Sequence, residues 1–344
     1  MKIKRLILLF FLTTNFAISQ ENNNLDFKNL LILVDVKIKN ETFKFLFDTG
    51  AETSVFFDIQ NKISIKKGQY FLAEDGFNNI DTMYFPKKDI KIYLPEFNIS
   101  GKGNGGLIIS KKIPEKLKIA KIYGILGNNF ISKFDWVYDV TNNKIKIVTN
   151  ESEINRVDYF NFSFNEKNLI SCNYTTDNGC VFKDTFLLDT GFYGNVCSKP
   201  ITIDCYSSFL DNINKVTTAA TNEIKISKII KSNFEIGNFK VVDLPTTIYS
   251  NDNAMNLVGI SFLRMFKTVY FLFSEKKILL EKQNNLSLRL FSPTIFNGKI
   301  NGYLEGMNQS SKNLFKKWTI DSEVNINNND FEFIDYPIKF IEFK

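Results

Sequence analysis

The chain contains the same short sequence twice, each time at the end of an apolar stretch. Residues 43–50 read Phe-Lys-Phe-Leu-Phe-Asp-Thr-Gly, and residues 185–191 read Thr-Phe-Leu-Leu-Asp-Thr-Gly. A second shared segment follows each copy, because residues 124–134 align without gaps with residues 256–266. Equivalent sequences in the same order predict two structural units that share one fold.

Each unit has the residue pattern of β-strands. Residues 34–39 alternate apolar and polar side chains, break at Asn40-Glu41 and resume at Phe43, which predicts a hairpin that leads into Asp48. Residues 144–148 alternate again, as expected for a closing strand. The chain is 44% hydrophobic and contains 35 phenylalanines, which suit half-buried sheet surfaces. We therefore predict an all-β fold with two lobes.

The N-terminus has the pattern of a secretory signal peptide. Lys2, Lys4 and Arg5 precede an apolar run that ends near Ala17, and small residues follow before a polar stretch. The alternative is a membrane anchor, for which the apolar run is short. We expect residues 1–19 to be removed and the protein to be exported to the periplasm or outside the cell, with no integral membrane segment left.

The repeat also sets the expected domain boundaries. We expect an N-terminal lobe at residues 20–148, a polar linker at 149–157 and a C-terminal lobe at 158–283. Residues 284–344 form a C-terminal extension outside the repeat. Within it, residues 318–328 are faintly similar to a stretch of PDZ domains, and the alternative is an accessory β extension packed on the second lobe.

The chain contains no histidine among its 344 residues, which limits its chemistry. Ser/His and Cys/His nucleophilic catalysis, as ordinarily built, both require an imidazole. The commonest metal sites require it too. Any hydrolytic reaction must therefore use carboxylates, Lys, Tyr or a bare nucleophile, and we expect neither a metal nor a cofactor.

An Asp-Thr-Gly loop after a buried strand suits carboxylate chemistry when two such loops face each other. The glycine allows a tight turn that brings amide N–H groups near the carboxylate, and the threonine hydroxyl can tie one loop to the other. Two carboxyls at hydrogen-bonding distance cannot both ionise, so they share a proton. The ionised member can activate a water while the protonated member donates to a peptide carbonyl. Asp48 and Asp189 are the candidate catalytic pair.

Residues 25–282 resemble two consecutive lobes of the retropepsin/pepsin aspartic protease superfamily, in the bacterial form with both lobes in one chain. Residues 45–54 are similar to the family's catalytic loop, and residues 124–127 to its apolar-apolar-Gly landmark. The resemblance implies β-rich lobes, a cleft between them and a flap over it. It also implies loop-supporting roles for Thr49, Gly50, Ser54, Thr190 and Gly191, and landmark roles for Gly127 and Gly259.

The second loop departs from the family pattern. Phe192 follows Gly191 where the family has a small residue, and Asn195 stands where Ser54 stands in the first lobe. Two functions follow from the sequence. The first is an aspartic endopeptidase, and the alternative is a weakly active or inactive exported protein that binds peptides with the same fold.

The remaining predictions concern partners and cysteines. Removing residues 1–19 takes away three positive charges and no acids, so the net charge falls from +6 to +3 and gives no argument for nucleic acid. We expect a peptide or protein substrate and a monomer, because both half-sites lie on one chain. The four cysteines can oxidise in an exported protein. They allow three pairings, of which the turn at residues 177–179 favours Cys172–Cys180 with Cys197–Cys205.

Overall fold

The structure is a computed structural model that describes most of the two repeats and parts of the remaining chain. The described ranges are 6–7, 31–74, 80–101, 106–114, 117–118, 120–149, 154, 156–176, 178–192, 195–199, 205, 216–217, 223–224, 226–249, 255–282, 287–291, 295–296, 299–300, 303–306, 333–337 and 339–342. Within these ranges strands dominate and the helices are single turns. The predicted all-β, two-lobed fold class is confirmed.

The first lobe is built on a sheet in which ten strands are described, in the order β1-β5-β6-β9-β4-β10-β3-β2-β7-β8. Their bounds are β1 (Leu6–Ile7), β2 (Leu33–Ile38), β3 (Glu41–Phe47), β4 (Val55–Phe57), β5 (Ile65–Glu74), β6 (Ile80–Pro86), β7 (Ile92–Leu94), β8 (Ile99–Gly101), β9 (Ile108–Ser110) and β10 (Ile122–Leu126). The predicted hairpin before Asp48 is β2–β3, with Leu33 opposite Leu46. Single helical turns lie at η2 (Pro95–Phe97) and α2 (Asn128–Ile131).

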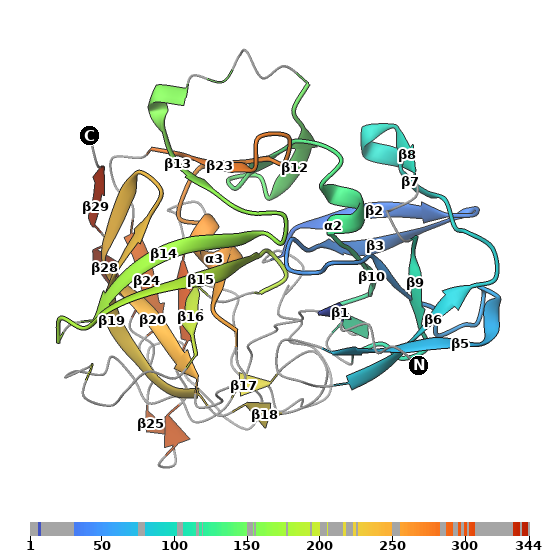
Figure 1. The fold of residues 1–344 in the computed structure, drawn as a ribbon, viewed down its shortest axis with the longest axis horizontal. Helices are drawn as coiled ribbons and strands as arrows, with labels where there is room; N and C mark the ends of the chain where they lie inside the picture. Colours follow the sequence, from blue (N-terminus) through green and yellow to red (C-terminus); the bar gives the residue numbers. More distant parts are fainter. Residues whose placement is uncertain are drawn as a thin grey trace.

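The second lobe is built on a sheet of seven described strands in the order β16-β21-β15-β14-β19-β20-β29, with a further pairing of β16 to β20. Their bounds are β14 (Leu169–Thr176), β15 (Val181–Asp189), β16 (Val196–Ser198), β19 (Ile226–Ile236), β20 (Phe239–Tyr249), β21 (Leu257–Gly259) and β29 (Lys339–Glu342). The helical turn α3 (Ile260–Leu263) follows β21 directly. Figure 1 shows this sheet and the first-lobe sheet on opposite sides of the molecule.

The two lobes share one local topology around the repeated loops. The order β4-β10-β3-β2 in the first lobe matches β16-β21-β15-β14 in the second. In each set the strand before the aspartate pairs in parallel with the strand that ends near the landmark glycine. It pairs in antiparallel fashion with the preceding strand of its own hairpin. The sequence repeat is therefore also a repeat of strand order.

A third sheet joins the two lobes. Its described strands lie in the order β12-β11-β22-β23-β13, and Figure 1 shows β13, β23 and β12 along the top of the view. The bounds are β11 (Trp136–Asp139), β12 (Lys144–Ile147), β13 (Tyr159–Ser163), β22 (Thr268–Leu272) and β23 (Lys277–Glu281), with η4 (Arg156–Asp158) before β13. At its centre Val137 pairs with Tyr270 and Tyr138 with Val269. The gapless repeat alignment continues to residues 137–138, which match residues 269–270, so two equivalent segments pair with each other in antiparallel fashion.

The hydrophobic core runs through this joining sheet from one lobe to the other. Phe47 contacts both Trp136 and Phe271, with ring centroids 5.2 Å and 6.0 Å apart. All three side chains are fully buried. Because Phe47 directly precedes Asp48, the packed rings fix the start of the first loop against both lobes.

Several predictions fall wholly or mostly outside the described residues. Of the predicted signal peptide, residues 6–7 are described, and they form β1, which pairs in parallel with β5. The rest of residues 1–19 lies outside the described ranges. The PDZ-like stretch at 318–328 also lies outside, whereas the last strand, β29, pairs with β20 of the second lobe. Short paired strands complete the described chain: β17 (Val216–Thr217), β18 (Glu223–Ile224), β24 (Ser287–Phe291), β25 (Ile295–Phe296), β26 (Lys299–Ile300), β27 (Tyr303–Gly306) and β28 (Phe333–Pro337). No helix in the described part of the chain has the length and apolar character needed to cross a membrane.

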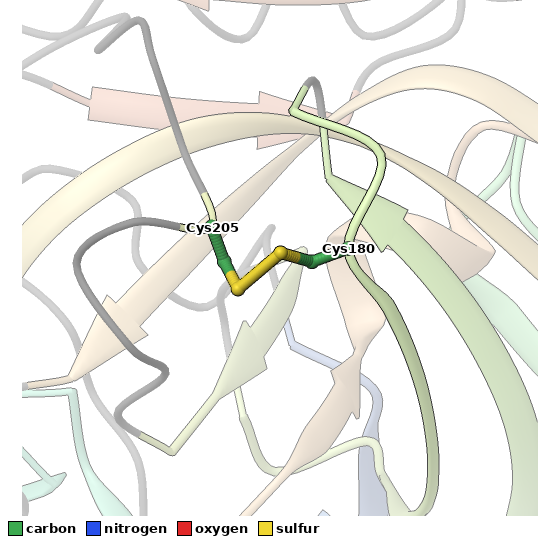
Figure 2. Close-up of a disulfide and its surroundings, with 2 residues drawn as sticks. All are labelled: Cys180 and Cys205. Atoms are coloured by element: carbon green, nitrogen blue, oxygen red, sulfur yellow. A yellow bond between two sulfur atoms is a disulfide. The ribbon is translucent and has the colours of Figure 1, made fainter.

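A disulfide joins Cys180 to Cys205, whose Cα atoms lie 5.4 Å apart (Figure 2). The favoured pairing of Cys172 with Cys180 and of Cys197 with Cys205 is therefore wrong. Cys172 and Cys197 are buried thiols in the second lobe. The strands β14 and β15 do form the expected hairpin, but it does not bring Cys172 to Cys180.

The register of that hairpin explains the error. Cys172 lies within β14 opposite Asp184 of β15. Cys180 lies near the turn, where its carbonyl accepts a hydrogen bond from the Thr176 backbone N–H at 3.0 Å. The two cysteines are therefore several strand positions apart along the hairpin, and a disulfide requires Cα atoms within about 7 Å.

Candidate active site

Each aspartate of the repeat stands at the end of a buried strand. Asp48 follows β3, whose last three residues are buried, and Asp189 is the last residue of β15. Both side chains are 0% exposed. The parallel neighbours β10 and β21 run beside these strand ends, with Leu126 opposite Phe47 and Gly259 opposite Asp189.

Backbone amides hold one oxygen of each carboxyl in the same way. Asp48 Oδ1 accepts hydrogen bonds from the N–H groups of Gly50 and Ala51 at 2.8 Å and 3.0 Å. Asp189 Oδ1 accepts them from Gly191 and Phe192 at 2.9 Å and 3.0 Å. In each lobe, then, the loop fixes Oδ1 and leaves Oδ2 for other partners.

The two carboxyls lie against each other across the lobes. A Cβ atom added at Gly50 would lie 2.4 Å from Asp189 Cγ, and one added at Gly191 would lie 2.5 Å from Asp48 Oδ2. Among the described atoms, neither Oδ2 has a hydrogen-bond donor. The carboxyls are close enough to share a hydrogen bond once one of them is protonated. Glycine is needed at both positions because any side chain would push the opposite carboxyl away.

The threonines of the two loops bind each other's strands. Thr49 Oγ1 donates to the Leu188 carbonyl at 2.7 Å, and Thr190 Oγ1 donates to the Phe47 carbonyl at 2.7 Å. Each hydroxyl also accepts the backbone N–H of the other threonine at 3.0 Å. These reciprocal hydrogen bonds fix the spacing between the loops that carry Asp48 and Asp189.

Burial raises the pKa of both carboxyls. Burial is the cause at Asp48, whose pKa rises although a hydrogen bond with the Asp189 side chain and the N–H groups of the two loops oppose the rise. Burial also raises the pKa of Asp189 well above its usual range, and the charge of Asp48 adds to that rise. The pair therefore keeps one proton over a range of pH in which isolated aspartates are ionised.

A second set of hydrogen bonds supports the first loop from behind. Asn129 Oδ1 accepts both the backbone N–H and the hydroxyl of Ser54, at 2.8 Å and 2.7 Å. Ser54 Oγ in turn accepts the Gly127 N–H at 3.0 Å. A Cβ atom at Gly127 would lie 2.8 Å from the Ala51 carbonyl oxygen, so the loop packs directly on the landmark glycine.

In the second lobe, the serine and the asparagine that support the loop have changed places. Asn195 occupies the position equivalent to Ser54, and Ser261 occupies the position equivalent to Asn129; both are buried. Here the Gly259 N–H donates to the Asn195 carbonyl at 2.7 Å. The pair of a hydroxyl and an amide side chain is thus present in both lobes, in reversed order.

Phe192 leaves the backbone of the second loop in the same arrangement as the first. Its carbonyl accepts the Ile260 N–H at 2.9 Å, as the Ala51 carbonyl accepts the Asn128 N–H at 2.8 Å. The Phe192 side chain is buried, at 2% exposure. The residue expected to disturb the loop therefore packs inside the lobe.

The sequence did not single out two asparagines that contact the first loop. Asn128, just after Gly127, and Asn168, just before β14, both donate side-chain hydrogen bonds to the Thr49 carbonyl, at 2.7 Å and 2.9 Å. The sequence did contain one signal for Asn128. Its equivalent in the repeat is the apolar Ile260, so a polar residue stands at this position in the first lobe alone. Asn168 had no such local signal, since it reaches the loop only through the packing of the two lobes.

Comparison with known proteins leaves the chain without an assigned family. No family model and no curated protein matches it. Two solved structures are similar: the basic 7S globulin from soybean, at a TM-score of 0.44 and 7% identity over 74% of this chain and 92% of that one, and the aspartic proteinase from Irpex lacteus, at 0.36 and 12% over 75% and 96%. Both TM-scores are below 0.5, so neither similarity establishes a shared activity.

Proposed function

We propose that the chain is an aspartic endopeptidase in which Asp48 and Asp189 share one proton and activate a water. The observation that carries the proposal is the pair of carboxyls, each held at Oδ1 by two backbone N–H groups and each lying over the other's glycine. Each Oδ2 atom lacks a donor among the described atoms. Two inner oxygens that face a shared space are what a general acid and a general base require.

The reaction follows from the protonation state of the pair. The ionised carboxyl removes a proton from water, whose oxygen bonds to the carbonyl carbon of the scissile peptide. The protonated carboxyl donates its proton to the carbonyl oxygen, which gives a neutral tetrahedral intermediate. This intermediate then breaks its C–N bond as the nitrogen receives a proton from one carboxyl and a hydroxyl of the intermediate gives its proton to the other, so the amine leaves and a carbonyl reforms. No covalent bond to the protein is formed.

The remaining features of the proposal follow from the same geometry. The substrate is an extended peptide or protein segment, which must reach a pair that is 0% exposed in this structure. Peptide binding therefore requires a change of conformation that exposes the carboxyls. Both carboxyls belong to one chain, which supports a monomeric enzyme. The Cys180–Cys205 disulfide supports an oxidising, exported location.

The test compares the rates of peptide cleavage by purified variants in which one aspartate is replaced by asparagine. Asp48→Asn and Asp189→Asn should each abolish cleavage of a fluorogenic peptide mixture. Asp58→Asn is the matched control, because Asp58 is equally buried but binds Lys62 N, Ile63 N and Lys111 Nζ instead of a second carboxyl. Cleavage that survives in either dyad variant, or is lost equally in the control, would contradict the proposal.

A second candidate is a peptide-binding protein of the same fold that does not turn over its ligand. Two observations favour it: the second loop carries Phe192 where the first carries Ala51, and the carboxyls are fully enclosed. Peptidase activity that pepstatin inhibits would exclude this candidate. Peptide binding without cleavage at any pH from acidic to neutral would favour it instead.

A further inference from the structure

Two asparagine side chains meet on the carbonyl of Thr49. Asn128 Nδ2 donates to this oxygen at 2.7 Å, and Asn168 Nδ2 donates to it at 2.9 Å. Asn168 Nδ2 also donates to Asn128 Oδ1 at 2.8 Å, so the amides bind each other. Asn128 belongs to the first lobe and Asn168 to the second, and the contact is a hydrogen-bonded junction between them.

The carbonyl that they bind belongs to the peptide group that holds Asp48. This group links Thr49 to Gly50, and the Gly50 N–H donates to Asp48 Oδ1 at 2.8 Å. The hydrogen bonds thus form a chain from the two side-chain amides, through the peptide group, to the carboxylate. Hydrogen bonds in such a chain polarise each other, so donors at the carbonyl strengthen the N–H as a donor.

The second lobe has isoleucine at both equivalent positions. Ile260 matches Asn128, since the N–H of each binds the residue after the loop glycine, Phe192 or Ala51. Ile32 matches Asn168, since the carbonyl of each accepts the N–H of the residue before the aspartate. Both isoleucines are buried, at 0% and 1% exposure. An isoleucine side chain cannot donate a hydrogen bond, so the peptide group that holds Asp189 has no such support from these positions.

We propose, on the basis of the peptidase function above, that Asn128 and Asn168 are positioning residues that make Asp48 the ionised member of the pair and Asp189 the protonated one. Donors at the far end of the peptide group favour negative charge on Asp48. Apolar neighbours at the matching positions of the other lobe favour the neutral form of Asp189. The direction agrees with the charge of Asp48, which adds to the rise in the pKa of Asp189.

The groups that act on Asp48 show how its pKa can be measured without the influence of Asp189. Within the described part of the chain, the titratable group acting on Asp48 is Asp189 from the opposite loop. The other groups that act on it are the N–H donors of Gly50, Ala51 and Gly191. An Asp189→Asn background therefore removes the titrating partner and leaves the Asp48 carboxyl to be measured alone.

The experiment measures the pKa of Asp48 by carbon-13 NMR of labelled aspartate carboxyls in the Asp189→Asn protein. Asn168→Gly removes one amide and keeps the positive φ of 56° that residue 168 adopts. Asn61→Gly is the matched control, because Asn61 has a φ of 54° and lies in an exposed turn. We expect Asn168→Gly to raise the pKa of Asp48 by about 0.5 to 1 unit and the control to leave it unchanged.

A second variant and a second background keep the test decisive. Asn128→Ile copies the second lobe and should raise the pKa of Asp48 in the same direction. In an Asp48→Asn background, Asn168→Gly should move the pKa of Asp189 less. An Asp48 pKa that stays within about 0.2 unit in both asparagine variants, or a larger shift at Asp189, would overturn the inference.

Activity separates this inference from the proposed function. In the protein with both aspartates, Asn168→Gly should move the acidic limb of the kcat/KM profile to higher pH by a similar amount, because Asp48 must lose its proton before it can act as the base. A mere loss of loop stability would lower kcat/KM without moving this limb. If no variant cleaves peptides, the proposed function fails, whereas the NMR titration still decides the inference.

Discussion

Replacing Asp48 by asparagine should stabilise the protein at neutral pH while it abolishes cleavage. The pKa of Asp48 rises from 3.8 to about 6 on folding. The folded state therefore binds more protons than the unfolded state between these values, and the unfolding free energy falls as the pH rises through this interval. The loss for this group is complete above the folded pKa and absent below the unfolded one.

The size of the effect follows from the shift. About two pKa units correspond to about 3 kcal/mol of unfolding free energy at pH 8. An asparagine side chain can still accept the Gly50 and Ala51 N–H hydrogen bonds through its Oδ1, so the loop contacts of Asp48 are kept. We expect Asp48→Asn to raise the unfolding free energy by about 3 kcal/mol at pH 8 and to change it little at pH 3. For a chain of this size the melting temperature at pH 8 should rise by about 5 °C.

The assay is thermal unfolding followed by tryptophan fluorescence from pH 3 to pH 8, which buried Trp136 should report. Asp58→Asn is again the control, because its carboxylate accepts the Lys62 and Ile63 N–H groups and lies 3.4 Å from Lys111 Nζ. Loss of these contacts should lower stability by about 1 to 3 kcal/mol. An Asp48→Asn protein less stable than the parent at pH 8 would refute the electrostatic reasoning.

Three further predictions concern the frame around the pair. Gly191→Ala should abolish cleavage and lower the melting temperature, because the new Cβ would lie 2.5 Å from Asp48 Oδ2; cleavage near the parental rate would contradict the geometry. Thr49→Val should lower the unfolding free energy by about 2 kcal/mol through its lost cross-lobe hydrogen bonds, whereas Thr49→Ser, measured by urea denaturation, should retain most of them. Cys180→Ser should cost about 3 kcal/mol in oxidised protein, as expected for a loop of 25 residues, and a melting temperature equal to that of the parent would rule out the bond.

The sequence contained enough information for the fold class because the repeat is long and periodic. Alternation at residues 34–39 predicted the β2–β3 hairpin, and the strand before each Asp-Thr-Gly is present in the structure. The equivalence of residues 137–138 with 269–270 had a consequence that was not foreseen, since these residues pair directly in the joining sheet. A sequence repeat identifies equivalent residues. It does not predict which of them are in contact, because that depends on how the two lobes pack.

The errors and omissions have local causes. A turn signal predicts that a hairpin closes, but the register decides which residues lie opposite, and Cys172 lies opposite Asp184 rather than near Cys180. Asn168 has a positive φ, at which asparagine is common, so its residue type alone indicates no functional role. Its hydrogen bond to Thr49 depends on the arrangement of two lobes and has no signature in the neighbouring sequence.

The reciprocal threonines limit how the two lobes can move at the carboxyls. Moving the lobes apart at the carboxyls would break the four hydrogen bonds of Thr49 and Thr190 together, at a cost of about 4 kcal/mol. The loops that carry Asp48 and Asp189 therefore behave as one rigid unit. Separating the two lobes at these loops is not a favourable way to expose the buried carboxyls. If the proposed function is right, a peptide must reach the carboxyls without separating the loops of Asp48 and Asp189, whose spacing the two threonines keep fixed.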